Sequence, residues 1–296
     1  MSEQLKNLPT SEIKWPPLGK VEVGNDVDFV YIMRKDGDFT MNPIALRMSE
    51  EYLLDEQKTK LTVLEEYDTF FSKLADTFRW AFVHKGNFEL HLYDPNQLAE
   101  EVRNKAGNTP IVSLDPLMNK GVIEHKVSRG FYLSGKKDFA QVPRPGSPPI
   151  HIQAQQISRE LNNIPIVVAE DDIFSGGGVI VSLSELLKQK LEVKETIPGI
   201  QIGKPKKLVE MGIHVNAVVV YEATQGNILD KVDLGDPRDY LIGASGLVIK
   251  MPNGEYARAP YIPPFVSTAA RASIPPQSET KFALKVLQAN LDFLTV

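Results

Sequence analysis

The chain has 296 residues, 42% of them hydrophobic and 24% charged, so it can bury one large or two ordinary hydrophobic cores. Its formal net charge of -5 and its scattered Lys and Arg residues argue against a nucleic-acid or anionic-membrane partner. The absence of cysteine excludes disulfides, thiolate metal sites and cysteine nucleophiles. No apolar stretch approaches the ~18 residues of a membrane span, and the N-terminus lacks a signal-peptide core, so we expect a cytoplasmic protein.

The N-terminal part of the chain combines a polar arm with strand and helix patterns. Residues 1–23 are interrupted by prolines, which predicts a surface arm anchored by Trp15. Residues 28–33 and 88–93 have strand patterns, and the second alternates like a half-buried strand. Between them, apolar residues recur at three- and four-residue spacing and predict a helix with a core-packing stripe: Leu64, Tyr67, Phe71, Leu74, Phe78 and Phe82.

The middle of the chain alternates strand and helix patterns. Asp94 and Pro95 predict the N-cap and first turn of a helix that continues to about Lys105. Further strands are predicted at 108–114, 164–169 and 212–221, with helices at 152–161 and 179–190. We expect a loop at 198–205 whose lysines face solvent: Lys204, Lys206 and Lys207. This order predicts an α/β fold with a mostly parallel central sheet flanked by helices. We expect an N-terminal helical elaboration and a C-terminal β-rich elaboration of this sheet.

Composition suggests a division into a surface arm (1–23), an N-terminal α/β elaboration (24–107), a core (108–223) and a C-terminal β-rich segment with a closing helix (224–296). Asn253 and Gly254 predict a hairpin turn. The closing helix, 281–294, is expected to bury one broad apolar face: Phe282, Leu284, Val286, Leu287, Leu291 and Leu294. A charged cluster is interpreted as a turn with surface ion pairs: Asp236, Arg238 and Asp239.

Residues 164–187 are the most informative stretch. An apolar run predicts a strand buried on both faces, which we expect to stop at Glu170. Asp171 and Asp172 follow, and three glycines at 176–178 precede the predicted helix. Successive glycines let backbone N–H groups converge on an anion at the positive end of a helix. Carboxylates beside such a loop suit a ligand with both hydroxyls and phosphates, or one that brings a bridging cation.

This segment resembles the ribose-phosphate loop of the type I phosphoribosyltransferases. That loop consists of an apolar lead, an acidic pair, an apolar pair, a hydroxyl residue, a small residue and a glycine. The corresponding positions here are residues 166–169, Asp171, Asp172, Ile173, Phe174, Ser175, Gly176 and Gly177. Glu170 is an additional residue before the acidic pair, and Gly176 and Val179 stand where the family usually has small or hydroxyl residues.

The resemblance implies a phosphoribosyltransferase-like fold and transfer of ribose 5-phosphate from phosphoribosyl pyrophosphate to an unidentified acceptor. Asp171 and Asp172 would act in catalysis and hold Mg²⁺ as the cofactor. The implied substrate-binding residues are Glu170, Ser175, Gly176, Gly177, Gly178 and Val179. Lys136 and Arg144, on a proline-rich loop with Lys137 and with Arg129 just upstream, would supply positive charge for the pyrophosphate.

Other interpretations stay open. The chain could be a non-catalytic protein of the same fold that binds a nucleotide or phosphoribosyl ligand as a signal. The site could instead serve another sugar phosphate, or the glycines could form a turn without a ligand. No dinucleotide fingerprint, P-loop or G-x-S-x-G elbow is present. Histidine spacing argues against zinc and leaves His151, beside the proline-rich loop, as the one histidine worth testing. A homo-oligomer also stays open.

Overall fold

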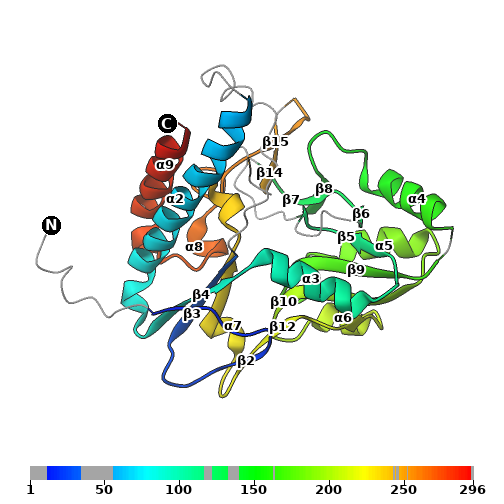
Figure 1. Ribbon diagram of the computed structural model, residues 1–296, viewed down its shortest axis with the longest axis horizontal. Helices are drawn as coiled ribbons and strands as arrows, with labels where there is room; N and C mark the ends of the chain where they lie inside the picture. The colour runs from blue at the N-terminus through cyan, green and yellow to red at the C-terminus, as the bar shows by residue number, and fades with distance from the viewer. Residues whose placement is uncertain are drawn as a thin grey trace, which may run out of the picture.

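The computed structural model describes residues 12–34, 56–116, 122–132, 140–162, 164–242, 244, 247–251 and 253–294. Within these residues the chain is an α/β protein with mostly parallel sheets flanked by helices (Figure 1). None of the helices described in these ranges is both long and apolar enough to span a membrane.

The central sheet is wholly parallel and has the order β2-β12-β10-β9-β5-β6, with β11 paired to β10. Its strands are β2 (Gly19–Val23), β12 (Val219–Ala223), β10 (Val193–Ile202), β9 (Ile166–Ile173), β5 (Ile111–Ser113), β6 (Ile123–Glu124) and β11 (His214–Val215). The helices of this part are α3 (Pro95–Ala106), α4 (Ile150–Leu161), α5 (Ile180–Lys188), α6 (Lys206–Glu210) and α7 (Ile228–Lys231). The predicted mostly parallel sheet flanked by helices is therefore confirmed.

Two further sheets complete the architecture. The first sheet is parallel and contains β1 (Glu12–Lys14), β4 (Phe88–Tyr93), β3 (Phe29–Arg34) and β13 (Val232–Gly235), in that order. The third sheet contains β15 (Tyr256–Arg258), β14 (Leu247–Lys250), β7 (Val127–Tyr132) and β8 (Ala140–Pro143), and only its β14–β7 pair is parallel. The remaining helical elements are α2 (Glu56–Phe82), η2 (Val83–Lys85), η4 (Pro237–Tyr240), α8 (Thr268–Arg271), η5 (Pro276–Ser278) and α9 (Glu279–Leu294).

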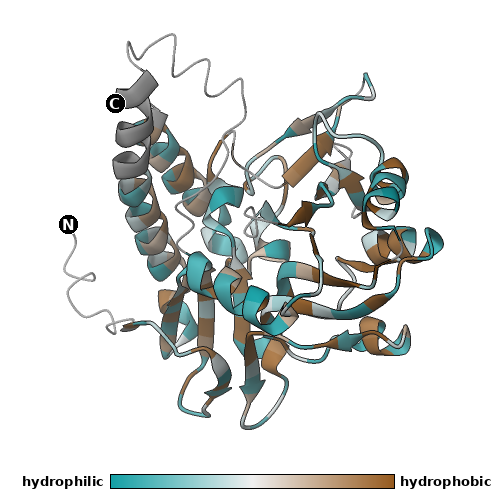
Figure 2. Ribbon diagram, turned by 45° about the vertical axis from the view of Figure 1, so that its right-hand side comes forward, coloured by the Kyte–Doolittle hydropathy of each residue, from teal (hydrophilic) through white to brown (hydrophobic). Residues whose placement is uncertain are grey.

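Hydrophobic clusters join these layers. One aromatic-rich cluster packs α2 and α9, which lie side by side in Figure 1, against one face of the first sheet. A second joins the other face of the first sheet to the central sheet and α3. A third packs α4 and α5 against β9 and β5. Figure 2 shows hydrophobic residues concentrated along the strands, as burial on both faces requires. The first sheet is thus held between helices and the central sheet.

Several sequence predictions are confirmed locally. The α2 stripe is buried from Tyr67 to Phe82, although the Leu64 side chain lies outside the described residues. Asp94 caps α3 by accepting a hydrogen bond from the backbone N–H of Asn96, with Pro95 in the first turn. The hairpin β14–β15 turns at Asn253 and Gly254. Predictions that depend on local capping and turn residues are therefore correct.

Other predictions about elements are wrong. Residues 12–14 and 19–23 are edge strands instead of an irregular arm, and Trp15 is 58% exposed instead of forming a buried anchor. Strand β4 is buried except at Glu89 because both faces of the first sheet are covered. On α9, Phe282 and Val286 are buried as predicted, but Leu284, Leu287 and Leu291 are exposed, and Ala289 and Phe293 complete the buried face. The Leu294 side chain lies outside the described residues. The predicted division into segments stays a prediction, although β13 and β14 pair with β3 and β7 from other segments.

Two corrections concern the centre of the site. Strand β9 does not stop at Glu170 but continues through Asp172 to Ile173, because its neighbour β10 pairs with it along that length. Residues 198–202 belong to β10 instead of a loop. Ile197, Ile200 and Ile202 are fully buried there, so core packing outweighs the turn signal of Pro198 and the glycine after it. The predicted strand at 212–221 is divided into β11 and β12.

Candidate functional site

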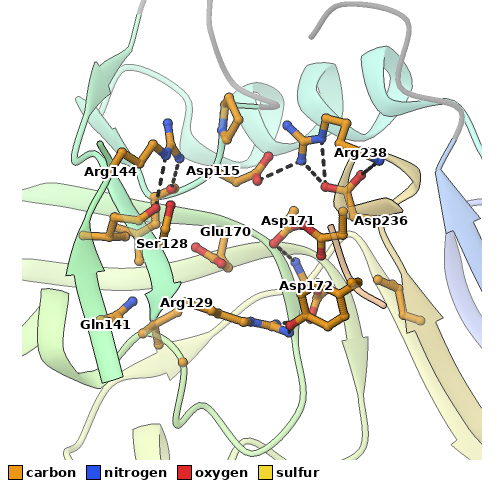
Figure 3. Close-up of a pocket in the computed structure, with 18 of the residues that line it drawn as sticks. Asp115, Ser128, Arg129, Gln141, Arg144, Glu170, Asp171, Asp172, Asp236 and Arg238 are labelled. Carbon is orange, nitrogen blue, oxygen red and sulfur yellow. Dashed lines mark hydrogen bonds and ion pairs between the residues drawn. The ribbon is translucent and has the colours of Figure 1, made fainter. Parts of the chain in front are cut away.

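A cavity of about 680 Å³ lies where strands of all three sheets meet (Figure 3). The residues that end or follow β5, β9 and β13 line it, among them Asp115, Asp172 and Asp236. Arg129 of β7 and Arg258 of β15 line it from the third sheet. The carboxyl ends of parallel strands are the usual place for ligands in α/β proteins. The predicted acidic segment therefore does border an open cavity.

The loop between β9 and α5 brings its glycines to this cavity. Gly176 has φ of +82°, and a Cβ added there would lie 2.8 Å from the Cγ of Leu208. Gly178, in contrast, has no heavy atom within 4 Å of such a Cβ position. The backbone N–H of Lys207 donates to the carbonyl of Ser175 at 3.2 Å, which ties the loop to α6. The loop is therefore closely packed at Gly176 and has free space beside Gly178.

A lysine missed as a site residue lies beside this loop. The Nζ of Lys207 is 3.3 Å from the Cβ position of Gly177. Lys204, Lys206 and Lys207 are all exposed, as predicted, but Lys207 also reaches the glycines. An anion at the loop would thus meet backbone N–H groups, the positive end of α5 and an ammonium group. Proximity to the glycines comes from the β10–α6 connection, which the sequence pattern did not reveal.

The three acidic residues of β9 have different surroundings. The Oδ2 of Asp171 lies 2.9 Å from Nη2 of Arg34, and its Oδ1 accepts the backbone N–H of Asp172 at 2.7 Å. The Oδ1 of Asp172 lies 4.0 Å from Nη2 of Arg129. Glu170 also lines the cavity, and its Oε2 is buried without a hydrogen-bond partner among the described residues. The predicted residues Glu170, Asp171 and Asp172 are therefore brought together.

Burial raises the pKa of each of these carboxyl groups. It raises the pKa of Asp172 to about 7, and neighbouring Asp171 adds to the effect. It raises the pKa of Glu170 well above its ordinary value, with Asp171 and Asp115 contributing. For Asp171, burial also raises the pKa, but the Arg34 guanidinium opposes it. Crowded carboxyl groups with raised pKa values are typical of sites that bind cations or exchange protons.

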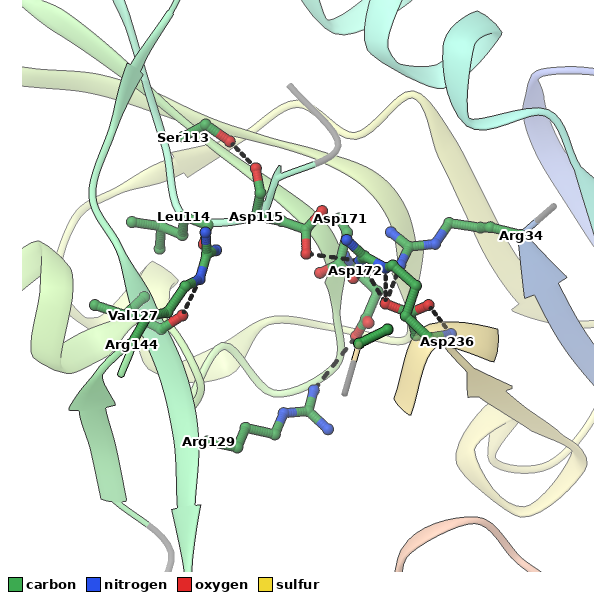
Figure 4. A network of polar contacts seen from close by, with 12 residues as sticks. Arg34, Ser113, Leu114, Asp115, Val127, Arg129, Arg144, Asp171, Asp172 and Asp236 are labelled. Carbon is green, nitrogen blue, oxygen red and sulfur yellow. Dashed lines mark hydrogen bonds and ion pairs between the residues drawn. The ribbon is translucent and has the colours of Figure 1, made fainter. Parts of the chain in front are cut away.

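A buried ion-pair network adjoins these carboxylates (Figure 4). Arg34 pairs with Asp171 and Asp236, and Arg238 pairs with Asp236 and, at 3.1 Å, with Asp115. Although burial opposes ionisation of Asp236, Arg238 and Arg34 hold its pKa below the ordinary value. The interpretation of Asp236 and Arg238 as surface ion pairs is wrong, because Arg238 is only 7% exposed.

The sequence contained a signal for these missed residues. Arg34 ends β3, Asp236 follows β13, and Asp115 comes shortly after β5. A charged residue directly after an apolar strand of a parallel sheet lies at the edge where ligands bind. These charges meet only because of the order of the strands in the sheets, which the sequence pattern does not reveal.

Of the basic residues predicted to act at the site, Arg144 lines the cavity and His151 does not. Lys136 lies outside the described residues. Arg144 lines the cavity but is held by the Glu124 carboxylate and by the carbonyls of Val127 and Leu114, at 3.1 and 2.7 Å. His151 is exposed on α4 and does not line the cavity.

Arg258 is an unpredicted addition. Burial lowers its pKa, and so do the nearby guanidinium groups of Arg144 and Arg238. Three arginines, from β15, from η4 and from just after β8, therefore line the cavity.

One group of carboxylates could hold a metal ion. Oxygen atoms of Asp115, Asp171 and Asp236 lie within 4.8 Å of one another. Carboxylate oxygens suit hard divalent cations, although nothing in this geometry distinguishes Mg²⁺ from other such ions. Of the two predicted metal ligands, Asp171 belongs to this group and Asp172 does not.

No protein-family model matches the chain, and no curated protein matches it either. What the site binds must therefore be inferred from its own chemistry.

Proposed function

We propose that this chain is a phosphoribosyltransferase-like enzyme that moves ribose 5-phosphate from phosphoribosyl pyrophosphate to an acceptor. One observation carries the proposal: an open glycine loop, a group of carboxylates and a group of arginines border the same cavity. A sugar with a phosphate at one end and a pyrophosphate at the other matches this arrangement.

The 5-phosphate is assigned to the loop at 175–179. Its backbone N–H groups and the positive end of α5 attract an anion. Lys207 adds a full positive charge beside Gly177. Ser175 is exposed and can donate its hydroxyl, whereas Val179 is buried and its backbone N–H already donates to the carbonyl of Gly176 at 3.4 Å.

The ribose is assigned to Asp171 and Asp172. Carboxylates accept hydrogen bonds from vicinal hydroxyls and stabilise positive charge that develops on the sugar ring as its bond to the leaving group breaks. Because β9 continues through both residues, their positions are set by the sheet and not by a flexible loop. A strand fixes such groups more accurately than a loop does.

The pyrophosphate is assigned to the side of the cavity lined by Arg144, Arg238 and Arg258. Burial and the guanidinium groups of Arg144 and Arg238 lower the pKa of Arg258, so an anion bound beside it would favour its charged form. Guanidinium groups bind phosphates bidentately and would stabilise the leaving group. A divalent ion held by Asp115, Asp171 and Asp236 would add charge for the pyrophosphate; Mg²⁺ is the cofactor we propose.

A non-catalytic protein that binds the same ligand as a signal is the second candidate. The loop favours it in one respect, since Gly176 and Val179 offer no side-chain hydroxyl to the phosphate. Release of pyrophosphate in the presence of candidate bases would establish the enzyme, whereas Mg²⁺-dependent binding without release would establish the signal-binding protein.

The proposed ligand site is tested with phosphoribosyl pyrophosphate and Mg²⁺ by thermal shift and calorimetry. The melting temperature of the wild type should rise as the ligand concentration rises. Asp172→Asn should weaken binding at least about tenfold, or ~1.4 kcal/mol. The fold should be retained, because the only ion pair of Asp172 among the described residues is a long one, 4.0 Å from Arg129. Asp171→Asn with Asp172→Asn should abolish binding.

Asp76→Asn, which alters an exposed carboxylate of α2, is the control and should bind like the wild type. If Asp172→Asn and the double variant also bind like the wild type, the proposed role of the acidic pair is wrong.

A further inference from the structure

Arg34 is a fully buried cation at the end of β3, with 0% of its surface exposed. Its Nη2 lies 2.9 Å from Oδ2 of Asp171 and 3.0 Å from Oδ2 of Asp236. Arginine is almost never fully buried unless it is paired. The guanidinium therefore joins a carboxylate of the central sheet to one that follows the first sheet.

Strand pairing explains why these charges meet. Strands β3 and β13 are parallel, with Met33 opposite Gly235, so Arg34 and Asp236 come next at the same level. Asp171 lies on β9 of the central sheet, and Figure 4 shows Arg34 directed toward it from β3. The position of Arg34 thus follows from how the two sheets pack.

The network continues from Asp236 to Asp115. Asp236 also binds Arg238, and Arg238 contacts Asp115 at 3.1 Å. Positive and negative groups therefore alternate from Asp171 to Asp115, through Arg34, Asp236 and Arg238. Buried ion pairs usually add little stability compared with well-packed apolar residues. A role in fixing the orientation of the groups that face the cavity accounts better for such a network.

We propose that Arg34 is a positioning residue, which fixes the carboxylate of Asp171 for the ribose and links it through Asp236 to Arg238 on the pyrophosphate side. This inference rests on the proposed function and extends it, because it gives a buried residue of β3 a role at the ligand site. Arg34 itself does not line the cavity, so it acts through Asp171 and Asp236.

The test separates positioning from stability. Arg34→Met leaves Asp171 and Asp236 without this partner and should destabilise the protein strongly. Arg34→Met with Asp236→Asn removes one surplus negative charge and should recover part of that stability. Asp236→Asn alone is the matched control, because it alters Arg238 in the same way but keeps Arg34. Chemical denaturation measures stability, and calorimetry measures affinity for phosphoribosyl pyrophosphate with Mg²⁺.

We expect the double variant to bind at least about tenfold more weakly than Asp236→Asn alone, even where the two are equally stable. Arg34→Lys, which keeps the positive charge, should recover part of the lost affinity. If the double variant and Asp236→Asn bind equally well, Arg34 serves stability only and the inference is wrong. If the wild type itself does not bind the ligand, the proposed function is wrong and this inference with it.

Discussion

At the scale of single residues, the two faces of β9 explain why neighbouring carboxylates have different partners. Successive side chains of a strand point to opposite faces. Asp171 accordingly meets Arg34 from the first sheet, and Asp172 approaches Arg129 from the third. The acidic pair predicted from the sequence thus lines the cavity with two unlike groups, one paired closely with a buried arginine and one 4.0 Å from Arg129.

Gly176 makes the loop before α5 sensitive to substitution. Its φ of +82° is unfavourable for other residues, and an added Cβ would approach Leu208 to 2.8 Å. Gly176→Ala should therefore destabilise the protein by about 1–3 kcal/mol in chemical denaturation. It should also weaken phosphoribosyl pyrophosphate binding, because the N–H groups of the loop would be displaced.

Gly178→Ala is the matched control for stability. Its added Cβ meets nothing within 4 Å, and its backbone does not need a positive φ. We expect a change within about 0.5 kcal/mol, as for most unconstrained surface positions. Equal unfolding free energies for the two variants would show that the loop conformation is not specified by Gly176.

At the scale of elements, β4 is connected to the central sheet by a buried polar group. Nδ1 of His91 lies 2.8 Å from the Tyr221 hydroxyl, and Nε2 lies 2.8 Å from Oε2 of Glu89. The Tyr221 hydroxyl in turn lies 3.0 Å from that of Tyr93. These contacts cross the interface between the first sheet and the central sheet, so their protonation affects how the sheets pack.

This interface should make stability depend on pH. Burial lowers the pKa of His91 below its ordinary value, although Glu89 opposes the effect. Below about pH 6.5 the unfolded chain therefore binds a proton that the folded protein binds less readily. Neutral His91 therefore contributes to the free energy of unfolding above that pH. This contribution is lost as the pH falls through 6.5 toward the lower pKa that His91 has in the folded protein.

Denaturation between pH 8 and pH 5 measures this effect. His91→Gln should show a smaller loss of stability on acidification than the wild type. His125, which is buried with its pKa lowered by burial, leaves some loss in the variant. His214→Gln changes a ring whose side chain is 71% exposed and lies outside this interface, so it is the control substitution. Parallel pH curves for the wild type and His91→Gln would contradict the expectation.

Elements with local signals were the ones that the sequence predicted well. Asp94 and Pro95 identify the start of α3, and the aromatic spacing identifies α2, because capping and amphipathic periodicity are short-range. Strand β10 was missed since Pro198 resembles a turn residue, and only the neighbours β9 and β12 make it a strand. The acidic segment and glycine loop were found, but Arg34 and Asp236 join the site only through long-range pairing.

At the scale of the whole molecule, sheets are built from distant parts of the chain. Strand β2 pairs with β12, β3 with β13, and β7 with β14. The buried cluster between the first sheet and the central sheet likewise contains residues from both ends, such as Val30 and Val232. Folding of the central sheet should therefore depend on segments outside the core predicted at 108–223.

A fragment of residues 108–223 tests this dependence. It would lack the edge strand β2 of the central sheet. It would also lack α3 and the first sheet, which cover one face of the central sheet, so apolar surface at Ile197, Ile200 and Ile202 would be exposed. We expect it to aggregate or to melt without a cooperative transition, whereas the full chain should show a cooperative transition in calorimetry.

The fragment would also lack Arg34, Asp236 and Arg258, which fix or line the ligand cavity. Even a soluble fragment should therefore bind phosphoribosyl pyrophosphate with Mg²⁺ at least about a hundredfold more weakly than the full chain, or ~2.7 kcal/mol. A fragment that unfolds cooperatively and binds like the full chain would instead show that residues 108–223 are an independent domain, with the two ends of the chain as additions to it.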